Sequence, residues 1–228
     1  MEQPSKLGKF LHFFGIILMG LTAVLILLGG IGTTCVALGA ENYEAFASIA
    51  PYKWLYQIFV VATILVGVLA IRATVNLVRG KTNAYRDSMI ALGLGLVIGG
   101  IHMIASQALR GSSMPGNYIV YVNAFTLLVF LLFRIPSIWE KVDFNHSNRK
   151  TNGGSAAGAA MIVAGVLTLT VHLWVGPTHT MGGVNYADVW HTQLTIAGWL
   201  LILVGSALAG ASLLEIKIPF LSTSNQRA

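Results

Sequence analysis

Residues 10–38 read FLHFFGIILMGLTAVLILLGGIGTTCVAL, an apolar run of 29 residues without a single Asp, Glu, Lys or Arg. About 20 apolar residues in a helix are enough to cross the ~30 Å hydrocarbon core of a bilayer. The run follows Lys6 and Lys9, as the apolar part of a signal peptide would, but it is about twice as long as such a part. We therefore predict an uncleaved first transmembrane helix.

Further apolar runs of similar length follow along the chain, so the sequence predicts an all-α polytopic bundle with six transmembrane helices. The predicted spans are residues 11–38, 55–78, 88–109, 118–138, 156–175 and 189–214. The longest polar stretch, residues 139–155, is a predicted cytoplasmic linker. It divides the chain into a four-span part, residues 1–138, and a two-span hairpin with a short tail, residues 156–228.

The composition excludes a water-soluble domain. Of the 228 residues, 55% are hydrophobic and only 10% are charged, against about 25% charged residues in soluble domains. The mean hydropathy is +0.74. A soluble fold of this size would have to bury several apolar runs longer than a bilayer span inside one small core. The composition therefore predicts that lipid covers much of the surface.

The basic residues indicate an orientation rather than a nucleic-acid partner. With the N-terminus in the cytoplasm, twelve of the fourteen Lys and Arg residues fall on the inner side, and only Lys53 and Arg110 fall on the outer side. Such an asymmetry is the positive-inside pattern, and no basic stripe suited to nucleic acid is present. We expect both termini in the cytoplasm, a bacterial-type cytoplasmic membrane as the location, and membrane proteins or a second copy of the chain as partners.

Three histidines are the most informative polar residues in the predicted spans. His102, His172 and His191 lie in three different helices, and all are expected near the outer side of the membrane. Gly95 and Gly99 lie seven and three residues before His102, so they share its helical face. Ionisable residues inside spans tend to mark function, and small residues beside a histidine leave room for a flat ring.

We therefore predict a membrane subunit of an electron-transfer system that binds haem b or a quinone through these three histidines and the two glycines. Neutral imidazole is a common axial ligand of haem iron. No C-x-x-C-H motif is present, so covalent haem attachment is excluded. The sequence identifies no catalytic residues, and it does not show whether the chain is an enzyme.

Two alternatives remain open at this level. His172, His179, Asp188 and His191 could surround a copper or zinc ion, which would indicate a transporter or a metal-handling protein. In the other alternative, the chain is a non-catalytic subunit or assembly factor, since small residues at four-residue spacing are also the usual contacts between membrane helices.

Overall fold

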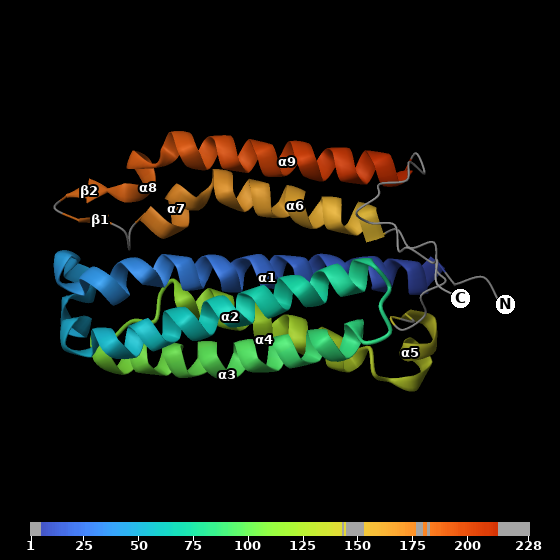
Figure 1. The fold of residues 1–228 in the computed structure, drawn as a ribbon, viewed down its shortest axis with the longest axis horizontal. Helices are drawn as coiled ribbons and strands as arrows, with labels where there is room; N and C mark the ends of the chain where they lie inside the picture. The colour runs from blue at the N-terminus through green and yellow to red at the C-terminus, as the bar shows by residue number, and fades with distance from the viewer. Residues whose placement is uncertain (1–5, 143, 145–152, 177–179, 182, 214–228) are drawn as a thin grey trace, which may run out of the picture.

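The computed structural model describes residues 6–142, 144, 153–176, 180–181 and 183–213, and nearly all of them are helical (Figure 1). The helices are α1 (Lys6–Gly39), α2 (Lys53–Val78), α3 (Ala84–Arg110), α4 (Gly116–Leu132), α5 (Pro136–Val142), α6 (Gly153–Leu169), α7 (Val171–Val175), α8 (Tyr186–Val189) and α9 (His191–Leu213). Two 3-10 helices, η1 (Ala40–Asn42) and η2 (Glu44–Tyr52), join α1 to α2. A short antiparallel hairpin of β1 (Thr180–Met181) and β2 (Val184–Asn185) lies between α7 and α8.

Long apolar helices dominate the structure, as the sequence predicts. Within the described residues, four helical segments are long and apolar enough to cross a membrane: α1, η2 with α2, α3, and α9. The number rises to five if α4 and α5 form one bent span. Many of their large apolar side chains point outward: Leu65, Ile104 and Leu203 are 60%, 66% and 62% exposed. Such surfaces suit contact with lipid.

The helices form two groups around the central helix α1 (Figure 1). On one side α1 packs against α2 and α4, and α3 packs against both of these helices. On the other side α1 packs against α6, which is covered in turn by α9. The start of α1 and the end of α9 lie at the same end of the bundle (Figure 1). After the orientation predicted from Lys and Arg, we call this the inner end, and we call the opposite end, which holds η1, η2 and the β-hairpin, the outer end.

The predicted fourth span, residues 118–138, is not one straight helix. Helix α4 ends at Leu132, and α5 begins at Pro136 at an angle of 98° to it. Proline has no N–H to continue the helical hydrogen bonds of α4, whereas it fits the first position of a new helix. The predicted span therefore ends early, and part of the predicted linker forms α5.

The predicted fifth span, residues 156–175, is also interrupted. Helix α6 ends at Leu169, and the five-residue helix α7 starts at Val171. Between them, the hydroxyl of Thr170 donates to the carbonyl oxygens of Val166 and Leu167, at 3.0 and 3.2 Å. Hydroxyl bonds of this kind compete with the backbone ladder and bend helices. Helix α6 alone, with 17 residues, is shorter than the usual membrane span.

Helices α6 and α9 approach each other through glycines. A Cβ atom added at Gly205 would lie 2.6 Å from the carbonyl oxygen of Gly158, and one added at Gly165 would lie 2.7 Å from that of Gly198. No side chain larger than hydrogen fits such contacts without moving a backbone. Two glycine pairs thus hold the α6–α9 hairpin together by close backbone packing.

Candidate functional site

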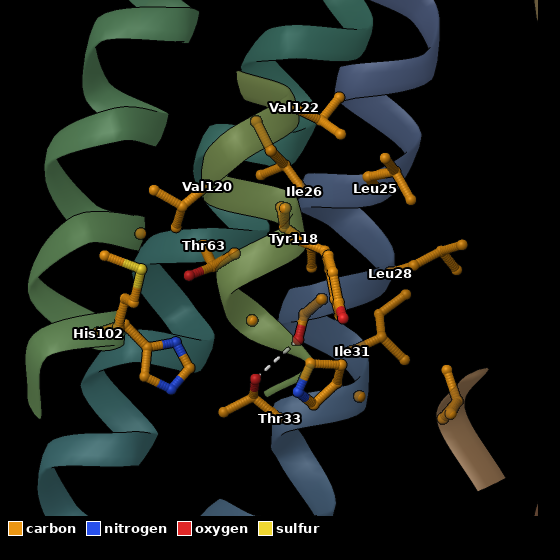
Figure 2. Close-up of a pocket in the computed structure, with 18 of the residues that line it drawn as sticks. Leu25, Ile26, Leu28, Ile31, Thr33, Thr63, His102, Tyr118, Val120 and Val122 are labelled. Atoms are coloured by element: carbon orange, nitrogen blue, oxygen red, sulfur yellow. Dashed lines mark hydrogen bonds between the residues drawn. The ribbon is translucent and has the colours of Figure 1, made fainter. Parts of the chain in front are cut away.

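A cavity of about 390 Å³ lies in the outer half of the bundle between α1, α3 and α4, and α6 and α7 border it. Figure 2 shows His102 extending from α3 on one side of the cavity, with Leu28 and Ile31 of α1 on the other. The wall is mainly apolar, and aliphatic side chains of α1, α4 and α7 contribute to it. Pockets for small organic ligands usually have this size and this apolar lining, with a few polar groups that orient the ligand.

The face of α3 that carries His102 forms one wall of the cavity. Gly95, Gly99, His102 and Ser106 all line it, because residues at these spacings point to one side of a helix. Gly95 is tight, since an added Cβ would lie 2.7 Å from the side-chain nitrogen of Asn123 on α4. Gly99 is less tight, with Val120 at 3.1 Å. The two glycines predicted as site residues therefore both border the cavity and permit the approach of α4.

Two aromatic side chains of α2 hold the His102 ring. The imidazole stacks on Phe59, with 4.6 Å between the ring centroids, and meets the edge of Tyr56 at 5.2 Å. The hydroxyl of Tyr56 is 2.8 Å from that of Ser106, which fixes the tyrosine against α3. Within the described residues, no hydrogen bond to either nitrogen of His102 is present. Its imidazole can therefore donate to, or accept from, a ligand in the cavity.

Arg110 borders the outer end of the cavity. Its guanidinium lies 4.6 Å from the centroid of the Phe46 ring, and one of its terminal nitrogens donates to the carbonyl oxygen of Met114. The buried Nε atom finds no acceptor among the described residues. The sequence predicts Arg110 only as one of two cations on the outer side. It does not predict that Arg110 lies on a cavity wall.

Of the three histidines predicted to form a site, the structure brings two together, His172 and His191. Their ring centroids are 5.7 Å apart, and the ring planes meet at 73°. His172 lies in α7 and is half-buried, whereas His191 is the first residue of α9 and is exposed. Their proximity follows from the chain, because both flank the turn of one helical hairpin. His102 does not join them, and its neighbours are the rings of α2.

The alternative metal site is only partly described. Asp188 lies in α8 and is exposed, and His179 lies outside the described residues. Among the residues that are described, no three His, Cys, Asp or Glu side chains lie close enough to share one metal ion. The glycines near this pair, Gly165 and Gly198, pack against the facing helix of the hairpin.

No protein family model, no curated protein and no solved structure matches this chain.

Proposed function

We propose that this chain is a six-span integral membrane protein with both termini in the cytoplasm, and that it is a quinone-binding membrane subunit of an electron-transfer system. The observation that carries the proposal is the mostly apolar cavity with the hydrogen-bonding nitrogens of His102 on its wall. The redox chemistry would belong to the quinone, and the protein would bind and orient it.

The asymmetry of Lys and Arg supports the proposed topology. In this topology α4 with α5 would be the fourth span, and α6 with α7 the fifth. Reporter fusions after Asn83 and Asn152 should report the cytoplasm, and fusions after Gly116 and Gly183 should report the outer side. An outside report at Asn152 would contradict six spans.

The chemistry of a quinone matches this cavity. A quinone head is a flat ring with two carbonyl oxygens, which accept hydrogen bonds, and its tail is a long apolar chain. The Nε or Nδ hydrogen of neutral His102 can donate to one carbonyl. The apolar wall formed by α1, α4 and α7 can contact the tail, since Leu28 and Ile31 line the cavity and are 50% and 53% exposed.

Binding of a short-chain ubiquinone and of a 1,4-naphthoquinone to the purified protein, measured by calorimetric titration, tests the proposal. His102→Leu should weaken binding about tenfold, since it removes one hydrogen bond in an apolar site. Gly32→Leu should weaken it as well, because Gly32 lines the cavity and an added Cβ meets nothing within 4 Å. The side chain can therefore fill the cavity without disturbing the helices.

Gly100→Leu is the matched control. Gly100 has the same open surroundings as Gly32, and it is not among the residues that line the cavity. The affinity of this variant should stay within about twofold of wild type. If neither quinone binds the wild-type protein, or if all three variants bind quinone as tightly as wild type does, the cavity is not a quinone site.

A second candidate, haem b or a bound metal ion, is favoured by the contact between His172 and His191 at 5.7 Å. Protein purified from its native membrane should then show a Soret band that is lost in both His172→Ala and His191→Ala and is retained in His102→Ala. If instead elemental analysis finds copper or zinc that either substitution removes, the pair binds metal. If neither cofactor is found, the two imidazoles pack only against each other.

A further inference from the structure

The two cations at the outer end of the bundle have different surroundings. Lys53 is bonded to the carboxylate of Glu41, with a nitrogen–oxygen distance of 2.9 Å, and both side chains are partly exposed. Arg110 is half-buried and makes no ion pair within the described residues. The charge of Lys53 is therefore compensated by Glu41, whereas no carboxylate among the described residues compensates the charge of Arg110.

The donors of Arg110 show what could compensate it. A guanidinium carries five N–H donors in a rigid fork. One terminal nitrogen donates to the Met114 carbonyl, one face of the group lies on Phe46, and the buried Nε has no acceptor among the described residues. Because the Nε is buried, a ligand would contact the terminal N–H groups of the guanidinium. Phosphate offers several acceptor oxygens and a negative charge in the geometry that arginine binds best.

The surface next to Arg110 is apolar and open to the side. Helix α4 packs mainly on α3 and α1, and α6 packs mainly on α9 and α1, so α4 and α6 are not closely packed together. Leu28, Ile31 and Tyr118 line the cavity at this opening, and each is at least half exposed. In a bilayer with the proposed topology, this opening would face the acyl chains of the outer leaflet.

We propose that Arg110 binds the phosphate of an anionic phospholipid, one acyl chain of which lies in the apolar groove of Leu28, Ile31 and Tyr118. A head group with a net negative charge compensates Arg110, which makes no ion pair within the described residues, and the acyl chain covers a groove that a soluble anion would leave open. The site shares the groove with the proposed quinone but not the His102 wall. It does not depend on quinone binding, although it relies on the same membrane insertion.

The test uses delipidated protein in detergent, titrated with phosphatidylglycerol and followed by native mass spectrometry. Arg110→Gln should weaken binding by about tenfold or more, because it removes charge-assisted hydrogen bonds to the phosphate. Lys53→Gln removes the other outer cation and should change the affinity by less than about twofold. Arg110→Lys should fall between Arg110→Gln and wild type, since an ammonium keeps the charge but not the fork.

Gly116→Leu provides a second test in which the charge is kept. Gly116 lines the mouth of the cavity, and an added Cβ there meets nothing within 4 Å. A leucine should therefore fill the groove and weaken phosphatidylglycerol binding, whereas Gly100→Leu should not. This pair keeps the proposal testable if Arg110→Gln fails to fold.

Competition assigns the ligand. Diacylglycerol, which has the chains without the phosphate, and inorganic phosphate, which has no chains, should both fail to displace the bound lipid. Phosphatidylcholine should bind several-fold more weakly than phosphatidylglycerol. Displacement by millimolar phosphate, equal binding of the two phospholipids, or equal losses in Arg110→Gln and Lys53→Gln would each overturn the proposal. None of these results depends on whether quinone binds.

Discussion

Glycine pairs between α6 and α9 bring two helices into contact, whereas two glycines at the cavity of the four-helix part, α1–α4, border open space. In the hairpin, Gly158 and Gly205 bring two backbones into contact, and an added Cβ at either would meet the other's carbonyl oxygen. In the four-helix part, Gly32 and Gly116 border open space. The hairpin is thus close-packed along its length, whereas the outer half of the four-helix part encloses a cavity. The presence of small residues alone does not predict whether two helices pack closely or enclose a cavity.

The largest effect is expected where the backbones touch. Gly205→Leu in α9 should destabilise the protein by about 3 kcal/mol or prevent folding, because overpacking cannot be relieved when the obstructing atom is a backbone oxygen. A Cβ atom added at Gly205 would lie 2.6 Å from the carbonyl oxygen of Gly158. Thermal unfolding in detergent, followed by circular dichroism, measures the change.

The control for this prediction lies in the same helix. An added Cβ at Gly210 meets nothing within 4 Å, so Gly210→Leu should change stability by no more than about 0.5 kcal/mol. Equal effects of the two substitutions would show that the glycine pairs do not hold the hairpin together.

A smaller effect is expected where a glycine borders the cavity. In Gly99→Leu the new Cβ meets only the Val120 side chain, at 3.1 Å, and the rest of the leucine can extend into the cavity. We expect a loss of about 1–2 kcal/mol, since a side chain can move where a backbone cannot. The neighbouring Gly100→Leu, in open surroundings, should be close to neutral. A loss in Gly99→Leu as large as that in Gly205→Leu would contradict the contrast between the two regions.

The same contrast separates what the sequence predicts from what it does not. Apolar runs fix α1, α2, α3 and α9 to within a few residues, because the length and composition of a span are local properties. The sequence does not predict the breaks after Leu132 and Leu169, since apolar residues lie on both sides of each break. Each has a local cause that could have been read, Pro136 in one case and Thr170 in the other.

The candidate site depends on packing between helices, which the sequence does not fix. His172 and His191 flank one turn, so their approach could be foreseen from the chain. His102 meets Tyr56 and Phe59 only because α2 packs on α3 in one particular rotation. Arg110 borders the cavity for the same reason. The chemistry of histidine identifies the candidate residues in the sequence, whereas their surroundings are set by the packing of the helices.

The smallest effect is expected for the buried hydroxyl pair between α1 and α4. The Oγ atoms of Thr22 and Thr126 are 2.7 Å apart, and both residues are fully buried. Thr22→Val and Thr126→Val should each cost about 1 kcal/mol, because each leaves one hydroxyl without its partner. The double variant should cost no more than either single one, since valine replaces threonine with little change in shape and no polar group is then left unpaired.

A double-mutant cycle should therefore give a coupling energy of about 1 kcal/mol, between the average of about 0.6 and the maximum of about 1.7 kcal/mol for hydrogen bonds between membrane helices. The bond is weak because an unfolded helix in the membrane also finds partners for its hydroxyl groups. The hairpin offers a matched pair, Ser155 and Ser212, whose Oγ atoms are 3.1 Å apart in half-buried surroundings. Its coupling, measured with alanine substitutions, should be smaller still, because water can replace the lost bond. If the serine pair proved the stronger, side-chain hydrogen bonds rather than glycine contacts would hold α6 against α9, and the distinction between the two regions would fail.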